Sequence, residues 1–221
     1  MSAHTVVFDV VGTLFTLDAP RLVLTDGAAP EHALDLWFAE SLRDYFARSH
    51  AGQYVGLREV LEAELPRTLR SLGMEPTVEF VERAMGAFGS LDPQPGARQA
   101  CRTLVEAGWT LIALTNSSEP VTRSLLESAG MASHFTQVIS CDELGVSKPH
   151  KKVYERAKQL ASGEVWLVAA HSWDIQGAKE AGLKAVWVAS KEFGYLSVYP
   201  PPDAKARDLE DACRILLSST S

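Results

Sequence analysis

The stretch His4-Thr5-Val6-Val7-Phe8-Asp9-Val10-Val11-Gly12-Thr13 decides the fold of this chain. Residues 4–8 form a short apolar and β-branched run, and Gly12 and Thr13 then break the pattern as a turn does. Asp9 is a lone acid at the end of this run, and a carboxylate is costly to bury unless it is paired. The sequence therefore predicts a buried strand that presents one functional acid at its end.

A different periodicity follows, from about residue 31 to residue 88. Apolar residues recur there at spacings of three and four, which is typical of helices that bury one face. They are Leu34, Trp37, Phe38, Leu42, Tyr45, Leu57, Val60, Leu61, Leu65, Leu69 and Leu72. No strand-like run interrupts the block, so we predict an all-helical insertion with boundaries near residues 16 and 90.

Beyond the loop at 91–96, helical and strand-like segments alternate. We expect strands at 109–115, 136–139, 164–169 and 184–188, and helices at 96–107, 119–129, 150–161, 174–181 and 207–217. Such alternation implies a parallel sheet with helices on both faces. The predicted fold class is α/β: a Rossmann-like core of residues 1–15 and 90–221, with residues 16–89 as an inserted helical subdomain.

Composition narrows the class of protein. The 221 residues are 46% hydrophobic and 22% charged, as in an ordinary globular protein, and the formal net charge is −7. No stripe of Lys and Arg interleaved with aromatic residues suggests nucleic acid binding. Neither a signal peptide nor a membrane-spanning run of about 18 apolar residues is recognisable. We therefore expect a cytoplasmic protein without nucleic acid or membrane partners.

Three cysteines stand at wide spacings without a C-x-x-C pair, which argues against a disulfide framework or a zinc site. They are Cys101, Cys141 and Cys213. We expect them to be buried core residues.

Polar residues cluster at the ends of the predicted strands. They are Asp9, Thr115-Asn116 and His171-Ser172-Trp173-Asp174, and Lys148-Pro149 precedes a predicted helix. Ligands bind such sheets at the carboxyl ends of the strands, where the strand order reverses. These four segments are therefore expected to converge on one pocket.

The same segments resemble the four motifs of the haloacid dehalogenase superfamily, in the right order. The first matches Phe8-Asp9-Val10-Val11-Gly12-Thr13-Leu14 and the second Leu114-Thr115-Asn116-Ser117; the third matches Ser147-Lys148-Pro149, and the fourth runs from Val168 to Asp174. Four ordered matches are specific, although each alone is weak. The resemblance implies that the helical insertion is a cap over the active site.

The resemblance also implies catalytic roles. Asp9 matches the nucleophile, and Thr13 belongs to the same motif. Lys148 would keep Asp9 ionised, because a nearby positive charge favours the carboxylate. Asp174 matches an acid that orients the hydrolytic water or holds the lysine, although an aspartate there is also a normal helix N-cap. His171 could act as a base, but a histidine at a strand end is more often structural.

Five further residues are candidates for substrate binding. Thr115 and Asn116 would hold a substrate carboxylate or the leaving group, with a simple turn as the alternative. Tyr154 matches a tyrosine of the dehalogenases, with core packing as the alternative. Val11 and Phe38 are expected in the pocket.

Two departures from the phosphatases of the superfamily favour the type II 2-haloacid dehalogenases. Phosphatases carry a second aspartate two residues after the nucleophile, where this chain has Val11, and an acid that completes a magnesium site, where it has Ala170. We therefore predict hydrolytic dehalogenation of a small 2-haloacid through an aspartyl ester, with a small-molecule carboxylate as substrate and no cofactor.

One departure from the dehalogenases leaves the substrate open. They place an arginine for the halide on the first cap helix, where this chain has Phe38, and the nearest arginines are Arg21 and Arg43. The alternatives are a phosphatase of the same superfamily, which would use Mg²⁺, and a non-catalytic ligand-binding relative. The oligomeric state is also open, with a homodimer as one option.

Overall fold

The computed structural model describes residues 4–190, 192 and 194–219. The predicted core domain also includes residues 1–3, 191, 193, 220 and 221, which lie outside the described residues. Within the described part, six strands form one parallel sheet in the order β3-β2-β1-β4-β5-β6. They are β1 (His4–Asp9), β2 (Thr110–Thr115), β3 (Phe135–Ser140), β4 (Glu164–Ala169), β5 (Lys184–Val188) and β6 (Ala204–Ala206).

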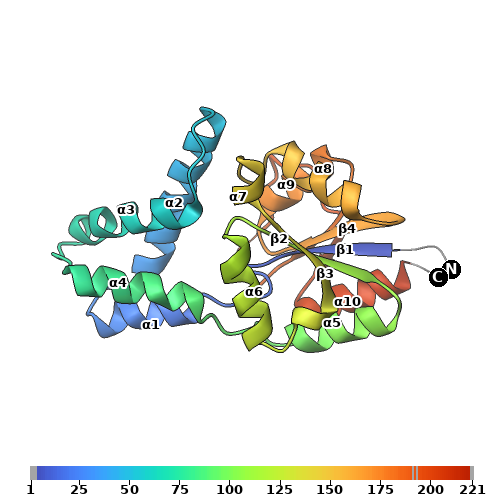
Figure 1. The fold of residues 1–221 in the computed structure, drawn as a ribbon, viewed down its shortest axis with the longest axis horizontal. Helices are drawn as coiled ribbons and strands as arrows, with labels where there is room; N and C mark the ends of the chain where they lie inside the picture. The colour runs from blue at the N-terminus through green and yellow to red at the C-terminus, as the bar shows by residue number, and fades with distance from the viewer. Residues whose placement is uncertain (1–3, 191, 193, 220–221) are drawn as a thin grey trace.

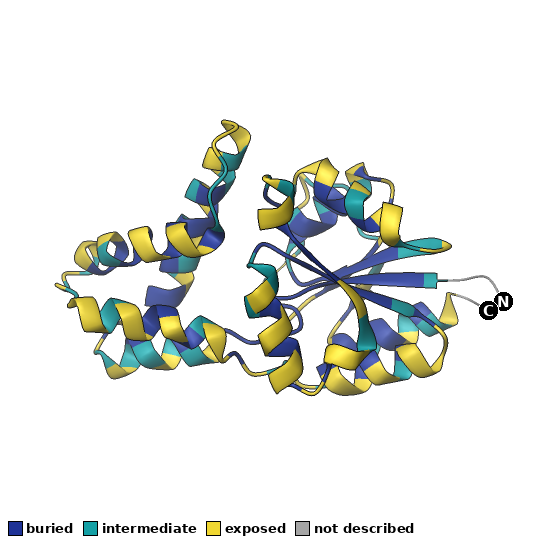
Figure 2. Cartoon of the chain, in the orientation of Figure 1, coloured by how far each residue is buried: buried dark blue, intermediate teal, exposed yellow. Residues whose placement is uncertain are grey.

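Helices cover both faces of the sheet, as Figure 1 shows. One face carries α5 (Ala97–Glu106), α6 (Glu119–Ser128) and α10 (Leu209–Ser218), and the other carries α7 (Cys141–Leu144), α8 (Lys151–Leu160) and α9 (Ser172–Glu180). Side chains alternate between the faces along each strand. In β1, Val6 and Phe8 join the first core, whereas Val7 joins the second. Figure 2 shows β1 and β2, in the middle of the sheet, as buried along most of their length, whereas the edge strand β3 is exposed in its first half.

The segment between β1 and α5 is helical in the described residues and extends away from the sheet (Figure 1). It contains α1 (Asp18–Asp26), α2 (Ala33–His50), α3 (Leu57–Ser71), α4 (Val78–Gly86) and the short 3₁₀ helix η1 (Ala87–Gly89). The α2 and α3 helices pack against each other through buried side chains such as Trp37, whose indole donates to the Leu61 carbonyl at 2.9 Å. The helical segment therefore has apolar packing of its own.

The two segments that join cap and core run side by side. Thr16 N donates to the Asp92 carbonyl at 2.8 Å, and Gln94 N donates to the Leu14 carbonyl at 2.8 Å. These bonds tie the exit from the core to the return into it. The exact domain boundaries at residues 16 and 90 stay predictions.

The fold class is confirmed: a parallel α/β core with an inserted helical cap. All five expected strands and five expected core helices are present. The sequence analysis missed β6 and α7, because three and four residues are too few to show a period. It also missed α1, which lies before the apolar repeat begins and carries Pro20 within its first turn. The three cysteines are buried as expected. No helix in the described part of the chain is long and apolar enough to cross a membrane.

Candidate active site

Asp9 lies at the carboxyl end of β1, and both of its carboxylate oxygens are engaged. Oδ1 accepts a hydrogen bond from Lys148 Nζ at 2.6 Å, and Oδ2 accepts one from the Thr13 hydroxyl at 2.6 Å. Thr13 Oγ1 in turn accepts a hydrogen bond at 2.9 Å from the backbone N–H of Ala170, which follows β4. Two neighbouring strands therefore fix the direction of the Asp9 carboxylate.

The turn after β1 brings Thr13 back to Asp9. Gly12 N donates to the Phe15 carbonyl at 2.8 Å, and Gly12 has a φ of 88°, which glycine adopts without a steric penalty. A Cβ at residue 12 would lie 2.8 Å from His171 Nε2. The first motif thus requires glycine both for its backbone angle and for its missing side chain.

Lys148 bridges two carboxylates. Its Nζ lies 2.6 Å from Asp9 Oδ1 and 2.7 Å from Asp174 Oδ2, and it also donates to the Leu114 carbonyl at 3.3 Å. The side chains of Lys148 and Asp174 are completely buried, whereas 6% of the Asp9 side chain is exposed. Burial alone lowers the pKa of Lys148, but attraction to Asp174 and Asp9 outweighs it and raises the pKa above the ordinary lysine value. The ammonium therefore stays charged.

Asp174 lies in the first turn of α9, which begins at Ser172; His171 occupies the N-cap position that we had considered for Asp174. Burial raises the pKa of Asp174, and the nearby Asp9 adds to this, while Lys148 opposes it; the net pKa is raised. Asp174 thus shares one ammonium with Asp9 and depends on it for its charge.

Tyr154 lies beneath this ion-pair network. Its hydroxyl donates to Asp174 Oδ1, and burial together with Asp174 raises the pKa of the phenol well above its ordinary value, so that it stays a donor. A Cβ at Gly177 would lie 2.2 Å from the tyrosine ring, so the glycine makes room for it. The side chain is completely buried. We predicted that Tyr154 contacts the substrate; its position instead favours an effect through Asp174.

Thr115 is the last residue of β2, Asn116 follows it, and both line the cavity above Asp9. Asn116 Oδ1 accepts a hydrogen bond from the backbone N–H of Lys148 at 3.0 Å, and Thr115 Oγ1 accepts one from Ser117 N at 3.0 Å. Asn116 therefore positions the lysine segment, and its amide N–H groups have no hydrogen-bond partner among the described residues. Their predicted contacts with substrate stay predictions.

A small cavity of about 20 Å³, which we call the catalytic cavity, opens above Asp9. It is lined by Asp9, Val11, Phe38, Leu42, Leu57, Thr115, Asn116, Ser117, His171 and Trp173. Six of the ten predicted site residues line it, and the other four, Thr13, Lys148, Tyr154 and Asp174, form the hydrogen-bonded network below. The structure thus brings all ten together.

Four lining residues were missed by the site prediction: Leu42, Leu57, Ser117 and Trp173. Leu42 and Leu57 belong to the apolar repeat of the cap, which looks the same in a core residue and in a pocket residue. Trp173 and Ser117 stand inside quoted motifs, so their positions beside predicted site residues were the available signal.

His171 and Trp173 form one wall of the catalytic cavity. Their rings stack with centroids 5.2 Å apart and an interplanar angle of 10°. His171 Nδ1 lies 3.9 Å from Glu192 Oε1, and Nε2 is buried with no hydrogen-bond partner among the described residues. Burial raises the pKa of Glu192, but the nearby His171 and the Ser172 backbone N–H, which donates to Glu192 Oε1 at 3.0 Å, outweigh it and hold the pKa below its usual value. An unpartnered nitrogen at a cavity wall is suited to hold a water molecule.

Neither arginine that we considered for the halide reaches the catalytic cavity. Arg21 forms an exposed ion pair with Asp35 at 2.7 Å, and Arg43 pairs with its neighbour Asp44 at 3.0 Å. Phe38 stands where the dehalogenases that this sequence resembles have an arginine, and its aromatic ring lines the catalytic cavity.

The described residues hold no cluster of three or more His, Cys, Asp or Glu side chains that could bind a metal. At Asp9, the Lys148 ammonium occupies the space between the two carboxylates, and positions 11 and 170 carry Val and Ala. These residues do not fit a magnesium ion, because they offer it too few oxygen ligands.

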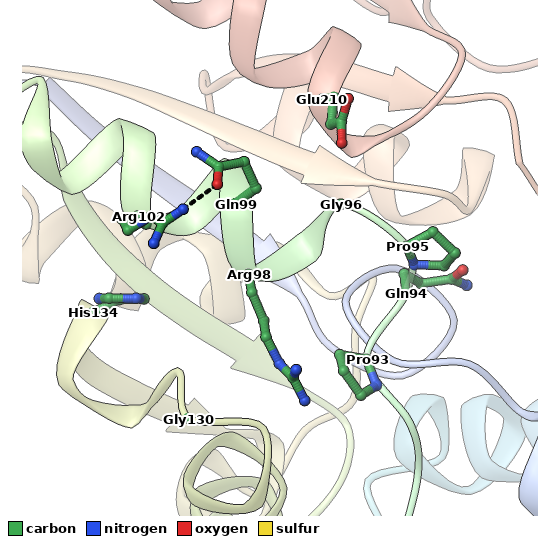
Figure 3. Close-up of a pocket in the computed structure, with 10 residues that line it drawn as sticks. All are labelled: Pro93, Gln94, Pro95, Gly96, Arg98, Gln99, Arg102, Gly130, His134 and Glu210. Carbon is green, nitrogen blue, oxygen red and sulfur yellow. Dashed lines mark hydrogen bonds between the residues drawn. The ribbon is translucent and has the colours of Figure 1, made fainter.

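A larger hollow of about 640 Å³ lies elsewhere, beside the start of α5 (Figure 3). Arg98 and Arg102 project into it from exposed positions, and Arg102 donates to Gln99. None of the motif residues lines it, so we place the site at Asp9 despite the smaller volume.

Comparison with known proteins agrees with this geometry. Residues 3–182 match the haloacid dehalogenase-like hydrolase family. The chain belongs to the haloacid dehalogenase-like hydrolases. An (S)-2-haloacid dehalogenase of Xanthobacter autotrophicus is 31% identical over 83% of this chain and 74% of its own length. A second relative in this family, (S)-2-haloacid dehalogenase 1 of Pseudomonas sp. strain CBS-3, is 29% identical over 81% of this chain and 82% of its own.

Among solved structures of haloacid dehalogenase-like hydrolases, the L-2-haloacid dehalogenase of Xanthobacter autotrophicus with chloropropionic acid covalently bound superposes with a TM-score of 0.85. It is 27% identical, and the match covers 98% of this chain and 99% of that one. The similarity therefore includes the cap as well as the core.

Proposed function

We propose that this hydrolase cleaves the carbon–halogen bond of a small 2-haloacid, with Asp9 as the nucleophile. The observation that carries the proposal is a buried Asp9 carboxylate, bound by Lys148 on one oxygen and by Thr13 on the other, beneath a cavity with an apolar Val11 where phosphatases have an acid. The relatives named (S)-2-haloacid dehalogenases support the same reaction.

The first step is an in-line displacement. A carboxylate oxygen of Asp9 attacks C2 of the substrate, a C–O ester bond forms, and the halide leaves with the electron pair of the C–X bond. The substrate loses its halide without needing a proton, so no acid at position 11 is required. Thr13 and Lys148 hold the carboxylate in one direction, and such orientation removes much of the entropic part of the barrier.

The second step is hydrolysis of the ester at the Asp9 carbonyl carbon. Water adds to this carbon, the ester C–O bond breaks on the Asp9 side, and the 2-hydroxyacid leaves with the oxygen that Asp9 supplied. We assign Lys148 to stabilise the negative charge that develops on the Asp9 carbonyl oxygen, and His171 Nε2, which lies at the cavity wall, to orient the water and accept its proton. The configuration at C2 inverts.

The leaving halide would meet neutral groups in this site. The Asn116 amide and the aromatic rings of Phe38 and Trp173, whose edges carry partial positive charge, line the cavity above Asp9. A substrate carboxylate would be held by the remaining N–H and O–H donors of Asn116 and Thr115.

Single turnover in ¹⁸O-labelled water with enzyme in excess tests the mechanism. Label should appear in Asp9 and be absent from the first 2-hydroxyacid formed, which mass spectrometry of the Asp9 peptide detects. The Asp9→Asn variant should release no halide from 2-chloropropionate, whereas the matched control Asp92→Asn, at an exposed position, should keep wild-type turnover. Label found directly in the product would refute the aspartyl ester.

A magnesium-dependent phosphatase is the competing activity. If the protein had this activity, it would hydrolyse p-nitrophenyl phosphate in the presence of Mg²⁺, and a chelator would abolish the hydrolysis. Since Lys148 fills the position between the two carboxylates, we expect no such turnover.

A further inference from the structure

A second cavity, of about 220 Å³, adjoins the catalytic cavity between cap and core. We call it the side cavity. Val11, Leu57 and Ser117 line both cavities, so the two spaces adjoin at these shared side chains. The side cavity is about ten times larger than the space above Asp9.

The catalytic cavity alone is too small for the proposed substrate. A volume of about 20 Å³ admits about one water molecule. Any 2-haloacid whose C2 lies at Asp9 must therefore extend beyond it, and the adjoining side cavity provides the room.

The wall of the side cavity is mainly apolar. Leu61 of α3, Met85 of α4, Phe88 of η1 and Val121 of α6 contribute to it together with Leu57. Leu57, Leu61 and Met85 are buried, and Phe88 packs edge-on against Trp37 at 5.5 Å between ring centroids. These contacts hold the wall in place without a ligand, so the cavity does not depend on the substrate to form.

The polar groups that line the side cavity carry both signs of charge. Arg58 and Glu59 lie at the start of α3, and Asp142 lies on α7, where it accepts a hydrogen bond from Tyr54. One cation beside two carboxylates is a poor binding site for an anion. This part of the cavity is therefore unsuited to a substrate that carries a second carboxylate. The apolar wall decides the chemistry, and it fits an unbranched alkyl chain.

We propose that the side cavity is a subsite for the alkyl chain of the substrate, so that the enzyme prefers 2-haloalkanoic acids longer than 2-halopropionate. This rests on the proposed function for placing C2 at Asp9. The chain would leave C2 past Val11 and Leu57 and end among Met85, Phe88 and Val121.

Binding of unhalogenated acids tests the subsite without turnover. Calorimetric titration of the intact protein with propionate, butanoate, hexanoate and octanoate should show affinity rising about fourfold for each methylene that enters the cavity. Adipate should bind more weakly than hexanoate, because its second carboxylate would enter an apolar space.

The substitution Val121→Trp fills the cavity from α6, at a partly buried residue outside the catalytic network. The variant should lose the dependence on chain length and still bind propionate within about twofold of wild type. Val105→Trp, the same change at an exposed residue of α5, is the matched control and should behave as wild type. Val121→Phe is a smaller filling variant, and circular dichroism checks that each variant folds.

Kinetics separate this inference from the proposed function. With 2-chloropropionate, 2-chlorohexanoate and 2-chlorooctanoate, kcat/KM should rise with length in wild type and stay flat in Val121→Trp. Chain-dependent binding without any halide release would refute the proposed function and leave the subsite intact. Equal affinity for all chain lengths in wild type, or tighter binding of adipate than of hexanoate, would overturn the subsite.

Discussion

The substitution Lys148→Met tests how the ion-pair network is held together. Asp9 and Asp174 both lie within 2.7 Å of Lys148 Nζ, and all three side chains are almost wholly buried. Removing the ammonium leaves two carboxylates facing each other in a space of low polarity. Breaking a buried ion pair in this way costs about 3–5 kcal/mol. The unfolding free energy of the variant should fall by about this amount at pH 7.

The pH dependence of the unfolding free energy gives a similar magnitude for the stability that Lys148→Met loses. In the variant, one carboxyl must keep its proton when folded, so its folded pKa is raised above its unfolded value of about 3.9. The folded state then binds the extra proton, and stability falls by about 1.4 kcal/mol per pH unit as pH rises above that value. From pH ~4 to pH ~7 the loss reaches roughly 4 kcal/mol. The variant should therefore be close to wild type near pH 4.

In the wild-type protein, the contribution of Lys148 to stability should not change with pH in the neutral range. Because the pKa of Lys148 is raised, the stability that its protonation supplies is fully present below the ordinary lysine value of 10.5 and is lost only as pH rises through the higher folded value. The network should therefore keep its contribution throughout the neutral range.

Urea unfolding followed by the fluorescence of the five tryptophans measures these differences at several pH values between 4 and 8. Lys151→Met is the matched control, since Lys151 forms an exposed pair with Glu155 and should contribute about 0–1 kcal/mol at every pH. A loss below about 1 kcal/mol at pH 7 for Lys148→Met, or a loss that does not change with pH, would contradict the burial and coupling of the network.

Two further changes test the groups around the network. Tyr154→Phe removes the hydrogen bond that lowers the pKa of Asp174. The acid limb of the pH profile of kcat/KM should therefore move to higher pH by about one unit. An acid limb at the wild-type pH would show that Tyr154 acts only in packing. Gly12→Ala places a Cβ 2.8 Å from His171 Nε2 at a φ of 88°. The variant should have an unfolding free energy lower by about 1–3 kcal/mol, measured by thermal unfolding, and a turnover lower by about tenfold or more, measured by halide release. Wild-type values in both measurements would show that the turn adapts to the added Cβ.

The core of the fold was predictable because its signals are local. A buried strand of six residues and an amphipathic helix of ten residues both leave a period in the sequence, and the alternation of the two implies a parallel sheet. The short strand β6 leaves no such period and gains its place only by pairing with β5, from Val186 with Ala204 to Val188 with Ala206. The order of the strands likewise depends on tertiary packing, which no single segment contains.

The candidate site was predictable where an ionisable or polar residue stood at a strand end. Asp9 and Asp174 carried that signal, whereas Lys148 preceded a predicted helix and was found by resemblance; the structure joins the three within hydrogen-bonding distance. Leu42 and Leu57 gave no signal, because an apolar residue has the same pattern whether it faces a neighbour or a cavity. Tyr154 was found by resemblance, but its direction toward Asp174 depends on the room left by a glycine from another helix, which sequence spacing does not show.

The two carboxylates that share Lys148 have different surroundings, and this difference assigns their roles. Asp9 lines the catalytic cavity and receives its hydrogen bonds from Lys148 and Thr13, which leaves one side of the carboxylate toward the cap. Asp174 is completely buried, with one oxygen on the lysine and the other on Tyr154. Only Asp9 can therefore approach a substrate carbon, whereas Asp174 is placed to hold the lysine in position and to keep it charged. If halide release survived Asp9→Asn and depended on Asp174 alone, this division between the two carboxylates would be wrong.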